Sequence, residues 1–201
     1  EAGLMILLKT STTMEATDVQ PSRLERAKQK IRDIMEHRQG GATGLIAYSG
    51  TAHLVMPLTK DERIITMMLE DIDSKLMPVD GDRLSEALLL AEQMVKQSGL
   101  PGSLLVIADT ATENLSDKSV LPVQILSLQP FGGEPDNGLK NIARTLRAAL
   151  IPLTPDQKDV EQITKDAETN HLDVNEPGQT ERWKDGGYLL IPVIALATLL
   201  W

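Results

Sequence analysis

The chain has 201 residues, which is enough for one sizeable domain with its own core, alone or with a short appendage. Its formal net charge of −9 provides no basic surface, so nucleic acid is excluded as an expected partner. The lack of cysteine excludes disulfides, thiolate metal sites and a cysteine nucleophile. Aromatic residues make up only 2% of the chain, so the core must consist of aliphatic side chains and methionine.

The first elements alternate between strand and helix. The apolar run Leu4–Leu8 is typical of a central strand covered on both faces. An amphipathic helix is expected after Ser22, with Lys30 on its polar side and its end at Gly40. Its apolar positions are Leu24, Ala27, Ile31 and Ile34. Residues 42–49 and 53–58 then predict a hairpin, in which Pro57 favours an edge position for the second strand.

The same alternation continues to the end of the domain. Helices are expected at residues 61–72 and 84–97, on either side of a loop at 77–82. Further strands are expected at 103–108, within 120–128 and at 151–153, with helices at 138–149 and 156–168. Strands that alternate with helices predict an α/β fold. We therefore expect a doubly wound, mostly parallel central sheet with one antiparallel edge strand and helices on both faces.

The C-terminal part differs in composition from the rest. Residues 1–168 form the predicted domain, and residues 169–187 are polar and read as a linker. Residues 188–201 are uncharged and almost wholly apolar, although shorter than the ~20 residues that span a bilayer. Trp183 and Tyr188 suit a membrane interface. The segment is interpreted as the start of a C-terminal transmembrane helix, with a buried terminal helix as the alternative.

Five stretches of the predicted domain match a known family pattern. They are Asp18–Lys28 (DVQPSRLERAK), Gly44–Thr59 (GLIAYSGTAHLVMPLT), Met77–Gly81 (MPVDG), Leu104–Asp109 (LLVIAD) and Pro152–Asp159 (PLTPDQKD). Through them the chain resembles a von Willebrand factor A (vWA) domain of the membrane-anchored, aerotolerance-operon (Bat-type) branch of bacterial proteins. The resemblance runs from Leu4 to about Ala167.

This resemblance implies a function as well as a fold. It implies a non-enzymatic protein–protein interaction or scaffold domain of a bacterial inner-membrane protein, with the domain in the periplasm. It further implies a role in envelope assembly or stress tolerance, with other components of a membrane complex as partners. The apolar C-terminal segment stands where that branch has its final membrane helix.

The resemblance also implies a site at the top of the sheet. Such domains hold a divalent cation in a metal-ion-dependent adhesion site, built from Asp-x-Ser-x-Ser after the first strand, a threonine before the third helix and an aspartate after the fourth strand. Here lysine replaces the leading aspartate, aspartate replaces the threonine, and Thr110 stands where glycine is usual in this branch. The site positions are Lys9, Ser11, Thr13, Asp82 and Asp109.

Lys9 changes what this site can hold. An ammonium has three donors and no acceptor, so it cannot ligate Mg²⁺ while it is protonated. One hypothesis is that Lys9 takes the place of the cation, held by Asp82, Asp109 and the Ser11 and Thr13 hydroxyls. The other is that Lys9 extends to solvent beside a vestigial site. Under both hypotheses, no metal and no cofactor is expected.

Three other interpretations of the polar residues remain open. Asp82 and Asp109 could supply the carboxylates of a Mg²⁺-dependent adhesion domain. Lys9 and Ser11 could act as the base and nucleophile of a Ser–Lys hydrolase, although no partner motif accompanies them. Asp80 and Asp82 could form an acid–base pair, but loop aspartates more often shape turns. The histidines His37, His53 and His171 have no spacing that indicates a zinc site.

Overall fold

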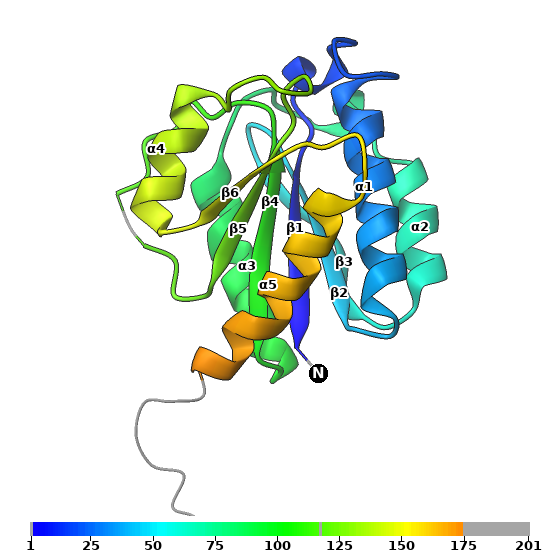
Figure 1. Ribbon diagram of the computed structural model, residues 1–201, viewed down its shortest axis with the longest axis vertical. Coiled ribbons are helices and arrows are strands. Elements are labelled where there is room, and N and C mark those ends of the chain that lie inside the picture. Colours follow the sequence, from blue (N-terminus) through cyan, green and yellow to red (C-terminus); the bar gives the residue numbers. More distant parts are fainter. Residues whose placement is uncertain (1, 117, 175–201) are drawn as a thin grey trace, which may run out of the picture.

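A six-stranded sheet forms the centre of the molecule in the computed structural model, which describes residues 2–116 and 118–174 (Figure 1). The strands are β1 (Gly3–Lys9), β2 (Thr43–Tyr48), β3 (Ala52–Thr59), β4 (Gly102–Ala108), β5 (Val123–Ser127) and β6 (Ala149–Pro152). They lie in the order β3-β2-β1-β4-β5-β6, and all neighbours are parallel except β2 and β3. The predicted, mostly parallel sheet with one antiparallel edge strand is confirmed.

The apolar run at the start of the chain forms the buried middle of this sheet. All residues of Leu4–Leu8 are 0% exposed, because β1 lies between β2 and β4 and is covered on both faces. By contrast, β3 is partly exposed along its length, as expected for an edge strand. The continuous run of aliphatic residues in β1 therefore reflects burial on two sides.

Helices cover both faces of the sheet (Figure 1). One face packs against α1 (Arg23–Arg38), α2 (Glu62–Glu70) and α5 (Lys158–Val174), and the other against α3 (Leu84–Ser98) and α4 (Asn137–Leu146). Two short 3-10 helices, η1 (Thr12–Glu15) and η2 (Ser74–Leu76), lie in the loops. The apolar side chains form one cluster on each face, so the doubly wound architecture is also confirmed.

Several boundaries differ from those expected. The helix predicted at 138–149 ends at Leu146, where Arg147 adopts a left-handed conformation with φ of 54°. A left-handed residue ends a helix, and here no glycine marks that end in the sequence. The next strand, β6, starts at Ala149 as a result. The last helix continues past residue 168 to Val174, into the stretch predicted as a linker.

Lys30 is buried, whereas the sequence pattern places it on the polar side of α1. Its exposed fraction is 4%, and its Nζ donates to Asp159 Oδ1 and to the Asp156 carbonyl, both at 2.7 Å. Asp159 is itself 1% exposed. This ion pair therefore joins the middle of α1 to the first turn of α5, so a residue outside the apolar stripe of α1 is buried through its charge.

The anchor predicted at the C-terminus is not tested by the structure. Within residues 2–116 and 118–174, no helix combines the length and the hydropathy needed to cross a membrane. The segment 188–201 and most of the predicted linker lie outside the described residues. The transmembrane interpretation of that segment stays a prediction.

Candidate functional site

The sheet topology brings two of the predicted site residues together. Lys9 is the last residue of β1, and Asp109 directly follows β4. Since β1 and β4 are parallel neighbours, their carboxyl ends meet at the same edge of the sheet, where open α/β sheets bind ligands. Lys9 is 2% exposed and Asp109 is 0% exposed. Lys9 therefore does not extend to solvent.

Among the described residues, four oxygen atoms lie near the ammonium of Lys9. It donates to the carbonyl oxygen and to Oγ1 of Thr110, both at 2.9 Å. Its Nζ lies 3.2 Å from Asp109 Oδ1 and 3.7 Å from Asp82 Oδ2. Thr110, which stands where glycine is usual in the Bat-type pattern, thus supplies a hydroxyl acceptor that glycine lacks.

The hydroxyl residues after β1 bond mainly to other groups. Ser11 Oγ and Thr13 Oγ1 lie 2.8 Å apart. Thr12 donates its backbone N–H and its hydroxyl to Asp80, at 3.1 and 2.8 Å. The Lys9 hydrogen bonds that the structure describes go to Thr110 instead of to these hydroxyls. Asp80 consequently ties two loops of the site together.

Asp82 contacts Lys9 less closely than expected. Its Oδ2 accepts hydrogen bonds from the Thr112 backbone N–H at 2.6 Å and from the Thr112 hydroxyl at 3.2 Å. Its Oδ1 is buried and has no hydrogen-bond partner among the described residues. Asp82 thus links the loop before α3 to the loop after β4 and pairs with Lys9 at longer range.

Arg23 is a second cation at the site, which the sequence reasoning missed. Its guanidinium NH1 donates to Asp109 Oδ2 at 2.9 Å, while Nε and NH2 donate to the two carboxylate oxygens of Asp18, at 2.8 and 2.5 Å. Arg23 is the first residue of α1, and the helix that follows a parallel strand begins at the same edge of the sheet. The position of Arg23 at the start of the helix after β1 was therefore the signal in the sequence that could have placed it at the site.

These contacts keep Asp109 ionised. Burial alone raises the pKa of the Asp109 carboxyl, but the charge of Lys9 and hydrogen bonds from Thr13, Lys9 and the Thr110 N–H outweigh it. The net result is a pKa below the ordinary value.

The phenol of Tyr48 lies near the same carboxylates. Burial, followed by the charges of Asp82, Asp109 and Glu113, raises the pKa of Tyr48 well above its ordinary value, so its phenol stays neutral.

The donor set does not fit a divalent cation. Each carboxylate oxygen of Asp109 already faces a side-chain cation, Lys9 on one side and Arg23 on the other. In the part of the chain that the structure describes, no group of three or more His, Cys, Asp or Glu residues could hold a metal ion. His37 and His53 contact Asp33 and Thr51 respectively and take no part in the site.

Comparison with solved structures places this fold among known ones. BatB from Bacteroides thetaiotaomicron aligns with a TM-score of 0.71 at 22% identity, over 86% of this chain and 100% of that chain. A membrane protein related to aerotolerance from Bacteroides fragilis aligns with a TM-score of 0.68 at 22% identity, with the same coverage. At these identities the likeness shows the fold alone.

Comparison of sequences identifies the family. A UPF0353 protein of Mycolicibacterium paratuberculosis is 23% identical over 157 residues, which cover 76% of this chain and 43% of the relative. One from Nocardia farcinica is 26% identical over 125 residues, 59% of this chain and 37% of the relative. The chain therefore spans less than half the length of these relatives. The sequence profile of the von Willebrand factor type A domain matches residues 4–111, more than half of the chain, and the chain belongs to that family.

Proposed function

We propose that this chain is a protein-binding vWA domain in which side-chain cations replace the dissociable metal ion. The observation that carries the proposal is the pairing of Asp109, whose two carboxylate oxygens face Lys9 at 3.2 Å and Arg23 at 2.9 Å. A cation that is part of the chain keeps the upper edge of the sheet in one charge state. The partner then binds a surface that needs no added ion.

Electrostatics favours this proposal over a Mg²⁺-dependent domain that uses Asp82 and Asp109. Two unit charges about 4 Å apart interact by about 4 kcal/mol at an effective dielectric constant near 20, and a dication roughly doubles that value. A metal ion beside Asp109 would meet this repulsion from Lys9 and again from Arg23. Both side chains would have to leave Asp109 before the ion could bind.

Calorimetric titration with Mg²⁺ and Mn²⁺ tests the proposal. We expect no stoichiometric binding to the unmodified chain. The double variant Lys9→Asp, Asp82→Thr restores the family pattern, and we expect it to bind the ions and to be stabilised by them. Adding Arg23→Gln should strengthen that binding, because Asp109 Oδ2 is then released.

A matched control separates the site from general charge effects. Lys158→Gln lowers the net charge by one, as the double variant does, at a side chain that is 79% exposed, and this variant should bind no divalent ion in the titration. Tight, stoichiometric binding of a divalent ion by the unmodified chain would refute the proposal and favour the Mg²⁺-dependent alternative.

The hydrolase alternative gains no support from the geometry. The Ser11 hydroxyl pairs with Thr13 Oγ1, and the described partners of the Lys9 ammonium are Thr110, Asp109 and Asp82. A Ser–Lys mechanism requires the amine within reach of the serine hydroxyl as its base. We therefore propose a non-enzymatic role.

The whole protein is proposed to work at a membrane. One structural relative is described as an aerotolerance-related membrane protein, and residues 188–201 are apolar and uncharged. We accordingly propose that this segment anchors the chain in a bacterial inner membrane, with the domain in the periplasm. Its partners would be other components of an envelope complex.

A further inference from the structure

An apolar groove lies at the end of the molecule opposite the Lys9 site. It has a volume of about 560 Å³ and lies between the last turns of α3 and the segment that leads into β5. Its apolar lining, called here the basal groove, consists of Leu89, Val95, Leu100, Pro101, Val120 and Leu121. Val120 is 88% exposed, Leu89 62% and Leu100 39%. Large apolar side chains gathered in this way are typical of a contact surface.

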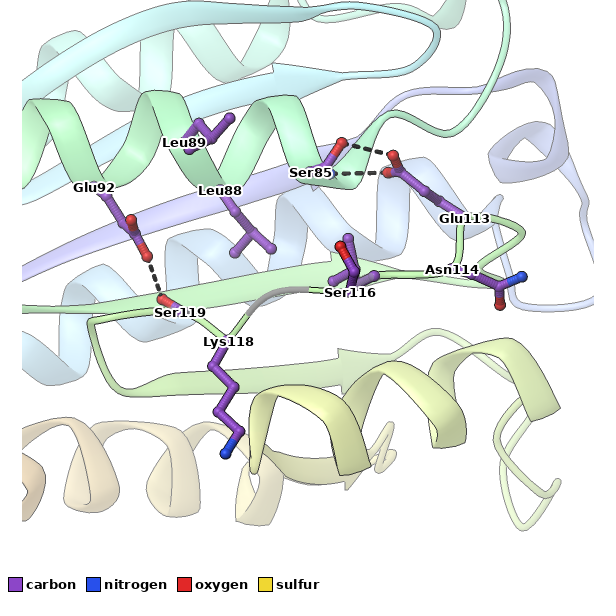
Figure 2. A pocket seen from close by; sticks show the side chains of 10 residues that line it. Ser85, Leu88, Leu89, Glu92, Glu113, Asn114, Ser116, Lys118 and Ser119 are labelled. Atoms are coloured by element: carbon purple, nitrogen blue, oxygen red, sulfur yellow. Dashed lines mark hydrogen bonds between the residues drawn. The ribbon is translucent and has the colours of Figure 1, made fainter.

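The structure holds the most exposed of these side chains in place. Figure 2 shows the adjoining pocket, where Glu92 on α3 meets Ser119. Glu92 Oε1 accepts hydrogen bonds from Ser119 Oγ at 2.6 Å and from the Val120 backbone N–H at 2.9 Å. The carboxylate thus fixes the backbone at Val120 while the side chain of Val120 faces solvent.

The basal groove lies where the described chain leaves the domain. The backbone N–H of Gly3 donates to the carbonyl of Pro101 at 2.8 Å, so the start of β1 adjoins the groove. The described part of α5 ends at Val174, at the same end of the molecule as the start of β1 (Figure 1). A membrane anchor that follows α5 would hold this end of the domain against the bilayer.

Two exposed lysines accompany the apolar side chains. Lys96 lines the basal groove, and Lys118 lines the adjoining pocket, which shares Leu89 and Glu92 with the groove. The Lys118 side chain points away from Glu92 (Figure 2), whose Oε1 accepts the hydrogen bonds of Ser119 and Val120. The same two pockets are also lined by Glu92 and Glu113, so the two lysines balance the carboxylates there within a chain whose net charge is −9. Apolar side chains flanked by lysines suit the boundary between lipid headgroups and acyl chains.

We propose that the basal groove is a lipid-contact surface that rests on the bilayer. Val120, Leu89 and Leu100 enter the interfacial region, while Lys96 and Lys118 meet the phosphates of anionic lipids. This inference rests on the C-terminal anchor of the proposed function. A tether makes the contact intramolecular, so even a weak lipid affinity suffices to orient the domain.

Site-specific fluorescence quenching tests the contact, and the absence of native cysteine permits single labels. The full chain carrying Val120→Cys with an environment-sensitive fluorophore is placed in vesicles of phosphatidylcholine and phosphatidylglycerol that contain brominated lipid. We expect about a twofold loss of fluorescence at position 120. Interfacial apolar side chains lie at the boundary between headgroups and acyl chains, where brominated lipid can quench the label. Position 67, labelled through Met67→Cys on α2, is 61% exposed and should not be quenched.

Two further measurements separate this inference from the anchor. Ala197→Cys reports on the anchor itself. The double change Lys96→Glu, Lys118→Glu should lower quenching at position 120 and leave position 197 unchanged. Equal quenching at positions 120 and 67 would overturn the lipid contact whatever position 197 shows. Absence of quenching at position 197 would refute the anchor.

Discussion

Asp109 faces Lys9 through one carboxylate oxygen and Arg23 through the other, so its removal leaves two largely buried cations without this partner. We expect Asp109→Ala to destabilise the domain by about 3–5 kcal/mol, as when a buried ion pair loses one member. Asp82→Ala should cost less, about 1–3 kcal/mol, because Lys9 keeps its closer partners while the Thr112 hydrogen bonds are lost.

Denaturant unfolding measures the difference in stability between the Asp109→Ala and Asp82→Ala variants. Glu36→Ala, at an exposed carboxylate, is the control. The paired exchange of Lys9 and Asp82 in the sequence predicts that Asp82→Ala destabilises the domain far more than removal of an exposed carboxylate does. If Asp82→Ala proved the more damaging change, Asp82 and not Asp109 would be the main counter-charge.

The ionisation of Asp109 makes stability depend on pH. Burial raises the pKa of its carboxyl, but Lys9 and the surrounding hydrogen bonds bring it below the ordinary 3.8. The unfolded chain therefore binds this proton more readily, so the stabilisation is present above about pH 4 and is lost as the pH falls through the folded pKa. The stability difference between the parent and Asp109→Asn should shrink below about pH 4 in acid-unfolding curves. A constant difference down to the lowest pH would contradict this.

Residue-level prediction succeeded only where topology decides the result. Adjacent parallel strands end at the same edge, which made the meeting of Lys9 and Asp109 predictable. Thr110 accepts the hydrogen bonds of the Lys9 ammonium because of the side-chain conformation of Lys9. The hydrophobic pattern of a sequence does not predict such a conformation. The role of Arg23 was missed, because a periodic pattern does not tell an exposed cation from one that pairs with a buried carboxylate at the first turn of a helix.

At the scale of the elements, the Lys30–Asp159 pair links α1 to α5 across one face of the sheet. We expect Lys30→Ala to cost about 3–5 kcal/mol, because it leaves the buried carboxylate of Asp159 unpaired. The matched change Lys158→Ala, at an exposed lysine, should leave stability almost unchanged. Urea unfolding of both variants checks this, and equal losses would show that the buried pair adds no stability.

Element types were easier to predict than their ends. Strong apolar runs and helical spacing identified each strand and helix of the sheet and its two faces. The end of α4 was missed because Arg147, an ordinary residue, takes the left-handed conformation there. The length of α5 was missed because the polar residues after 168 look alike in a solvated helix and in a linker.

For the whole molecule, the proposed function predicts partner binding without added ions. The full-length protein, for which a membrane anchor is proposed, should retain the same partners with and without a chelator after solubilisation in mild detergent and affinity capture. The physical reason is that, in the proposed mode of binding, side-chain cations take the place of an exchangeable ion at Asp109. Loss of partners in the chelator, restored by Mg²⁺, would favour the cation-dependent alternative.

The ion pairs of Asp109 with Lys9 and Arg23 also have a consequence for the folding of the chain during synthesis. Asp109 lies 86 residues after Arg23, so both cations are made long before their counter-charge. A partly synthesised chain that ends before β4 would carry two positive charges facing an unfinished core. Closing this three-way contact therefore requires that β4 has paired with β1.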